Sequence, residues 1–221
     1  YPVNANRKLK TINNWRTEIS ALFGFIEHTD TTDKPGWRAV ELAENQDLVE
    51  GFKVFLYNFQ YPGAHIKPKE VMEQIKQGVH FKPAQYILKM LRYANREGGN
   101  SIGITKPEVC HCIFNDLRVT RDQEGIERTW SRISYNRRQR MTYDETGDVI
   151  RYAGDIIDYM EIANLLKTYD SRTYYLNTLE EDSIVQFCES EEWFGEYDAM
   201  IANRSGSMKE VKDCINGWFS Y

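Results

Sequence analysis

The sequence predicts a mainly α-helical fold with small β wings, built as two to three winged-helix (helix-turn-helix) subdomains. Apolar residues recur at helical spacing along most of the chain, and short extended runs follow two of the expected helices. Residues 84–117 also have the outline of two helices joined by a polar turn. An ordinary helical hairpin is the alternative for that stretch, because only some helical hairpins bind DNA.

The first expected subdomain covers residues 1–58. Thr11–Phe23 has the apolar spacing of a helix, and the runs 25–27 and 37–42 read as strands on either side of a polar tip. Pro35 and Gly36 mark a turn there. A helix followed by a strand, a tip and a second strand is the order in the C-terminal half of a winged helix. A further helix is expected over residues 46–59.

The second expected subdomain covers residues 59–141. A short helix is expected at 68–77, and a longer helix from Ala84 stops at Gly98 and Gly99. The next helix has a strong start signal, because Thr105 can cap it and Glu108, three residues later, can close a capping box. A basic helix over residues 125–141 completes this subdomain.

The third expected subdomain covers residues 142–200, and residues 201–221 are expected to be a linker or the start of a further domain. The strongest helical periodicity of the chain runs from Gly147 to Tyr169. A turn, a strand over 173–176 and a helix over 179–190 follow.

The composition is that of a folded protein with room for several cores. The chain has 221 residues, 41% of them apolar, and no apolar run near the 18 residues of a membrane span. It starts at Tyr1 rather than Met, so a piece of a longer protein is expected. Its four cysteines form no disulfide-like framework, which favours a cytoplasmic location.

Charge is distributed unevenly along the chain. The net charge is −5, but residues 1–140 carry 22 Lys and Arg against 16 Asp and Glu, whereas residues 141–221 carry 6 against 17. A local basic surface matters more than the total charge for binding a polyanion. We therefore expect a polyanion-binding face in the first two thirds of the chain.

The arginine-rich segment 128–140 is the strongest candidate site. Guanidinium groups bind phosphates and read guanine edges, and amide side chains pair with adenine. A solvated charged surface is the alternative, and the DNA-binding interpretation requires these arginines to share one face and to lack carboxylate partners. The expected base contacts are Arg128, Arg132, Tyr135, Asn136, Arg137, Arg138, Gln139 and Arg140. The expected accompanying DNA contacts, mainly to phosphates, are Arg7, Lys8, Lys10, Arg38, Lys106, Arg118 and Arg121.

Two other site types are disfavoured. The run Cys110-His111-Cys112 would place alternating ligands on different sides of a helix, so a zinc site is not expected. Glu210-Val211-Lys212 has the spacing of a metal-dependent nuclease motif but lacks the surrounding apolar strand. No catalytic residue, metal ligand or cofactor is expected within this segment.

The order of several motifs resembles the DNA-recognition region of type IIS restriction endonucleases of the AlwI-like group, which includes site-specific nicking endonucleases. The motifs are WRAVELAEN at 37–45, FQYP at 59–62, GITKPE at 103–108 and the helix 149–168 leading into YYLN at 174–177. FokI has a similar, more distant arrangement of winged helices.

The resemblance, which covers about residues 7–198, implies winged helices wrapped around double-stranded DNA. It also implies a separate nuclease domain that uses Mg2+ in the parent protein, and a second nuclease subunit or domain as a further partner. The alternative is a winged-helix module for protein interaction or transcriptional regulation, without a nuclease.

Overall fold

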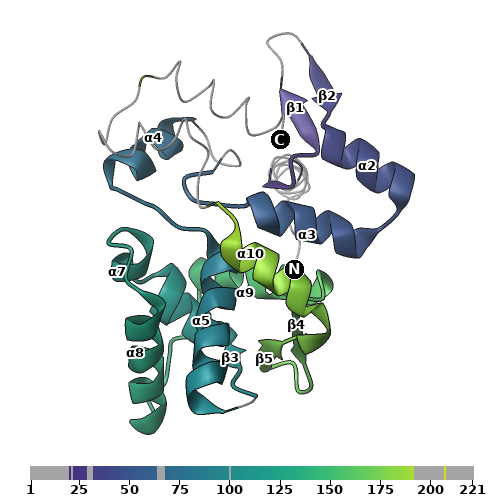
Figure 1. The fold of residues 1–221 in the computed structure, drawn as a ribbon. Coiled ribbons are helices and arrows are strands. Elements are labelled where there is room, and N and C mark those ends of the chain that lie inside the picture. Colours follow the sequence, from purple (N-terminus) through teal and green to yellow (C-terminus); the bar gives the residue numbers. More distant parts are fainter. Residues whose placement is uncertain are drawn as a thin grey trace, which may run out of the picture.

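The computed structural model describes residues 20, 22–28, 32–63, 68–99, 101–191 and 207. Within these residues the fold is mainly α-helical, with one three-stranded antiparallel sheet and a separate two-stranded hairpin (Figure 1). The prediction of a mainly helical fold with small β elements is confirmed. The expected linker at 201–221 lies almost entirely outside the described residues.

The N-terminal described part is a hairpin followed by two helices. Strand β1 (Ile26–His28) pairs antiparallel with β2 (Asp33–Pro35), and helices α2 (Trp37–Asn45) and α3 (Leu48–Asn58) follow. The predicted strand over residues 37–42 is therefore wrong. Apolar and polar residues alternate there, but the segment continues into Ala43 and Glu44, and such helix-favouring residues prevail over a six-residue pattern.

The centre of the molecule is α5 (Pro83–Gly98), which follows the short α4 (Pro68–Lys76). Both helices were predicted. The apolar face of α5 is fully buried at Ile87, Leu88 and Leu91, and α8 and α10 pack against the helix. The side chain of Asn95 then shapes the polar turn, because its Oδ1 accepts hydrogen bonds from two backbone N–H groups beyond the helix end.

The segment after α5 contains β3 (Ile104–Thr105), α6 (Lys106–Val109), the π-helical η1 (Cys110–Phe114), α7 (Leu117–Thr120) and α8 (Ile126–Arg138). The predicted capping box is confirmed. Glu108 donates its backbone N–H to Thr105 Oγ1 at 3.4 Å, and Thr105 N donates to Glu108 Oε2 at 2.9 Å.

The last described elements are α9 (Asp148–Ile162), β4 (Leu166–Thr168), β5 (Thr173–Leu176), η2 (Thr178–Glu180) and α10 (Glu181–Glu189). The helix predicted to reach Tyr169 ends instead at Ile162. Asn164 has a φ of 57°, the left-handed conformation that closes a helix, and Leu165 N donates to Met160 O. The apolar residues after it continue the core as a strand.

The three-stranded sheet joins parts of the chain that are far apart in sequence. Its order is β3–β5–β4, with Ile104 opposite Tyr174 and Leu166 opposite Leu176. Gly103 precedes β3, and a Cβ atom there would lie only 2.7 Å from Tyr174 O, so the close approach to β5 requires glycine.

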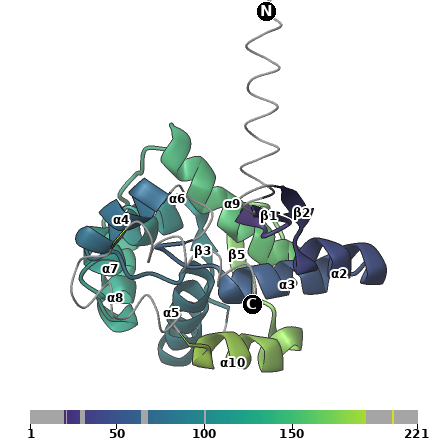
Figure 2. The same ribbon diagram turned by 90° about the horizontal axis from the view of Figure 1, so that it is seen from above.

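Aromatic packing joins the N-terminal helices to this sheet unit. Phe23 and Phe55 have ring centroids 4.4 Å apart, and Tyr159 of α9 contacts both rings. Seen from above, α3 lies beside α9 (Figure 2). None of the helices in the described ranges is long and apolar enough to cross a membrane.

Candidate nucleic-acid interface

The arginines of helix α8 lie on two different sides of the helix. Ile126, Thr129 and Ile133 face inward, and Thr129 and Ile133 are fully buried. The 3.6-residue period then places Arg128, Tyr135 and Arg138 together on the opposite, solvent-facing side, where all three are exposed. Tyr135 is 54% exposed, so its ring and hydroxyl are open to solvent.

Arg137 lies on the inner side and is bound to the capping box. Its Nε donates to Glu108 Oε1 at 2.6 Å, and one terminal nitrogen donates to Glu108 Oε2 at 2.8 Å and to Gly103 O at 2.7 Å. Burial on its own raises the pKa of Glu108. The bonds and charge of Arg137, with the donors of Thr105, outweigh burial and hold that pKa below its ordinary value of 4.5.

Arg132 is held by two further carboxylates, one buried and one half-buried. It lies 2.5 Å from Glu124 and 2.9 Å from Asp116, and it donates to Cys112 O at 3.1 Å. Asp116 is buried and also receives a bidentate pair from Arg118 at 2.7 and 2.8 Å. Burial raises the pKa of Asp116, but the bond from Arg118 and the charge of Arg132 keep it below 3.8.

The outer arginines have different surroundings. Arg128, Arg138 and Arg140 are exposed, and none of them forms an ion pair with another residue that the structure describes. Gln139 is exposed beside them, whereas Asn136 turns inward and donates to the Tyr143 hydroxyl at 3.0 Å. Along α8 and at its end, Arg128, Tyr135, Arg138, Gln139 and Arg140 are thus exposed, and we call these five residues the outer arginine face.

The end of α8 has an uncommon backbone conformation. Arg140 has a φ of 53°, its N–H donates to Arg137 O, and Met141 N donates to Asn136 O. This is the Schellman motif, in which the left-handed position is usually glycine or asparagine. An arginine in this position is conformationally strained, and such strain tends to occur at functional positions.

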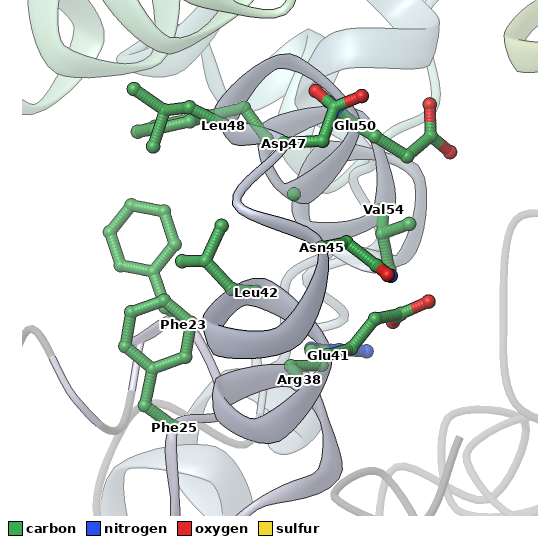
Figure 3. Close-up of a pocket in the computed structure, with 12 residues that line it drawn as sticks. Phe23, Phe25, Arg38, Glu41, Leu42, Asn45, Asp47, Leu48, Glu50 and Val54 are labelled. Atoms are coloured by element: carbon green, nitrogen blue, oxygen red, sulfur yellow. The ribbon is translucent and has the colours of Figure 1, made fainter.

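The other predicted contacts lie in separate surroundings. Lys106 Nζ is 2.6 Å from Asp158 of α9, and a terminal nitrogen of Arg121 donates to Gln77 at 2.6 Å. Arg38 is buried on α2 and lines a pocket of about 360 Å3 with Phe23 and Leu42 (Figure 3). Burial lowers the pKa of Arg38 to about 10, which leaves it charged at neutral pH. Arg7, Lys8 and Lys10 lie outside the described residues.

Within the described part of the chain, no group of three His, Cys, Asp or Glu side chains could hold a metal ion. Cys110 and Cys112 are buried in the core, and the ring of His111 stacks on Tyr143 with centroids 5.3 Å apart. Burial, the largest influence, raises the pKa of both thiols. These cysteines therefore pack as small apolar side chains.

Sequence reasoning missed a second group of cations. Lys89, Arg92 and Arg96 are spaced i, i+3 and i+7 along α5, and Lys167 of β4 lies across a groove from them. The helical spacing was a usable signal, but the apolar face of the same helix dominated its interpretation. The contribution of β4 could not be seen without the fold.

The sequence and the structure match known proteins. The family model described as "Restriction endonuclease BpuJI - N terminal" matches residues 1–219. The fold is similar to a solved chain described as "Crystal structure of pyrene- and phenanthrene-modified DNA in complex with the BpuJ1 endonuclease binding domain". The TM-score is 0.79 at 24% identity, over 96% of this chain and 77% of that one. No curated protein matches the sequence.

Proposed function

Because the chain belongs to the family of the N-terminal region of restriction endonuclease BpuJI, we propose that it recognises a short sequence in double-stranded DNA. The family confirms the predicted resemblance to the recognition region of a restriction endonuclease. In this proposal the parent protein is of type IIS, and a separate Mg2+-dependent nuclease domain cuts at a fixed distance from the site. A second nuclease subunit or domain would serve cleavage of both strands.

The observation that carries the proposal is the outer arginine face. Arg128, Arg138 and Arg140 are exposed and have no carboxylate partner among the residues that the structure describes, in a chain whose net charge is −5. Arginines that form no ion pair within the fold are available to bind phosphates and guanine edges. The structural neighbour, which is described as a complex with modified DNA, adds support.

The order of elements supports a winged helix. Helix α5, strand β3, helix α6, helix α9 and the hairpin β4–β5 follow one another as in that fold, with α7 and α8 inserted before α9. Helix α9 carries three half-buried acidic side chains, Asp155, Asp158 and Glu161, and acidic side chains disfavour approach to phosphates. We therefore place the base contacts on the inserted α8.

The division into residues 1–58, 59–141, 142–200 and 201–221 belongs to the same proposal. The sheet pairs β3 from the second region with β5 from the third, so these two regions share one sheet. The first region, with the β1–β2 hairpin, would be a separate winged-helix unit.

Selection of bound duplexes from a random pool tests the function. We expect one short asymmetric sequence to be enriched, and about six phosphate contacts would give log affinity a slope near −5 against log salt. Affinity for random duplex with no enriched sequence would contradict recognition. Absence of duplex binding at low salt would favour the protein-interaction alternative.

The contribution of α8 is tested by Arg138→Ala. Affinity for the selected duplex should fall about tenfold or more, because a base or phosphate contact of arginine is typically worth about 1–3 kcal/mol. Lys76→Ala is the matched control, since Lys76 is an exposed cation on α4 away from α8. An unchanged dissociation constant for Arg138→Ala would remove α8 from the interface.

A further inference from the structure

A second cationic surface lies between α5 and the β4–β5 hairpin. A groove of about 850 Å3 is lined along α5 by Lys89, Arg92 and Arg96 and across from it by Lys167. Figures 1 and 2 both show α5 between α8 and this hairpin. We call this surface the hairpin groove.

The charge balance of the hairpin groove is positive. Its carboxylates are Glu127 and Glu181, and Glu181 is already paired with Arg92 at 2.7 Å. Arg96 has only a long exposed contact of 3.8 Å with Glu97, and Lys167 forms no ion pair among the described residues. A polyanion would therefore find uncompensated charge on both walls of the groove.

Tyrosine rings lie among these cations. Tyr169 is 79% exposed, its ring centroid is 6.0 Å from that of Tyr175, and Lys167 Nζ lies 5.9 Å from the Tyr169 ring. Tyr93 lines the α5 wall, where Arg96 lies 5.8 Å from its ring. Tyrosine hydroxyls, lysines and arginines are common donors to phosphate and sugar oxygens.

The hairpin is held in shape before any ligand arrives. Asp170 accepts hydrogen bonds from the backbone N–H groups of Arg172 and Thr173 at 2.9 and 2.8 Å. These backbone bonds, the largest influence, lower the pKa of Asp170, so the turn is fixed by a charged carboxylate at neutral pH. A preorganised turn loses little conformational entropy on binding.

The dimensions fit the backbone of a duplex. Lys89 and Arg96 are seven residues apart on a helix, which is a rise of about 10 Å, or about three base pairs along one strand. The groove also reaches Ile126 and Glu127 at the start of α8, next to Arg128 of the outer arginine face. A strand leaving that face can therefore continue along the groove.

We propose that the hairpin groove binds the sugar–phosphate backbone of duplex DNA, outside the bases read by α8. This inference rests on the proposed function. The contacts would be independent of sequence, so they would strengthen binding to all duplexes by a similar factor.

The test compares the double variant Arg96→Ala/Lys167→Ala with Lys69→Ala/Lys76→Ala. Both remove two positive charges, but the second pair is exposed on α4, away from the groove. The groove variant should bind both selected and random duplex about tenfold more weakly, with the salt slope less steep by about 2, while the ratio of the two affinities stays the same. The α4 variant should match the wild type.

Hydroxyl-radical footprinting of a selected duplex with long flanks gives the second readout. The groove variant should lose protection over a stretch of backbone that Arg138→Ala still protects. If the groove variant binds DNA with wild-type affinity and gives an unchanged footprint, this inference is overturned and the proposed function still stands. If the wild-type protein neither binds nor protects duplex DNA, the proposed function fails and the inference fails with it.

Discussion

The two sides of α8 carry the same residue type with opposite consequences. On the inner side, Arg132 and Arg137 bind the carboxylates of Glu124, Asp116 and Glu108, of which the last two are buried. On the outer side, Arg128 and Arg138 are exposed and form no ion pair with a described residue. The same arginine-rich sequence therefore contains residues that hold the fold and residues available for a ligand.

The difference teaches that the position of carboxylates, rather than the number of arginines, decides which cations are available. Asp116 and Glu124 precede α8, and Glu108 lies in the capping box. An arginine next to a buried carboxylate stays paired with it, because a charged carboxylate left without a partner in the interior would lower the stability of the fold. Counting cations in residues 128–140 overestimates the binding surface for this reason.

The largest effect is expected when an arginine of the inner side is removed, and it is an effect on the stability of the fold. Arg137→Ala should lower the free energy of unfolding by about 2–3 kcal/mol, because it leaves Glu108 buried without its partner. The loss is smaller than for a fully buried pair, since the Arg137 side chain is 37% exposed and solvent screens its charge. Urea denaturation measures the change.

Arg138→Ala is the matched control for that measurement. It removes a neighbouring arginine from the outer side, and its unfolding free energy should stay within about 0.5 kcal/mol of the wild type. Equal destabilisation by the two substitutions would contradict the division of α8 into two sides.

A smaller effect is expected at the end of α8. Arg140→Gly should stabilise the fold by about 1 kcal/mol, because glycine adopts the left-handed conformation without strain. DNA affinity should fall in the same variant, since a cation of the outer arginine face is lost. Asn164→Gly, at the corresponding position after α9, should gain only a few tenths, because asparagine tolerates this conformation. A loss of stability in Arg140→Gly would show that its side chain supports the fold.

The smallest effect is on the pH dependence of stability. The folded pKa values of Glu108 and Asp116 lie below their ordinary values of 4.5 and 3.8, so the unfolded chain binds more protons in acid. Their stabilisation is fully present above about pH 5 and is lost as pH falls through the lowered folded values. Unfolding midpoints measured between about pH 6 and pH 3 should fall less steeply for Arg137→Ala than for Arg138→Ala. Parallel pH profiles would contradict the assigned role of Glu108.

Much of the helical framework could be predicted because its signals are local. The capping box at Thr105 and Glu108 and the apolar periodicity of α5 depend on residues within a few turns of one another. The short helix at 68–76 has Pro68 at its first position for the same local reason.

The rest of the fold and of the candidate site depends on contacts between different elements, which a local sequence pattern does not reveal. Helix α9 ends at Ile162 because Leu166 pairs with Leu176 in the sheet, although the helical periodicity continues through Leu166. The partners of Arg137 and Arg132 come from other elements of the fold. The hairpin groove likewise combines two elements that are distant in sequence, because α5 ends at Gly98 and β4 begins only at Leu166.

The pairing of β3 with β5 also sets an order for how the domain folds. Ile104 and Thr105 pair with Tyr174 and Thr173, so the sheet closes only after the whole segment containing α8 and α9 has left the ribosome. Closure of so long a loop is entropically unfavourable and slows folding. We therefore expect α8 to be held only loosely on a nascent chain, and a product truncated before β5 to lack a native arrangement of its arginines.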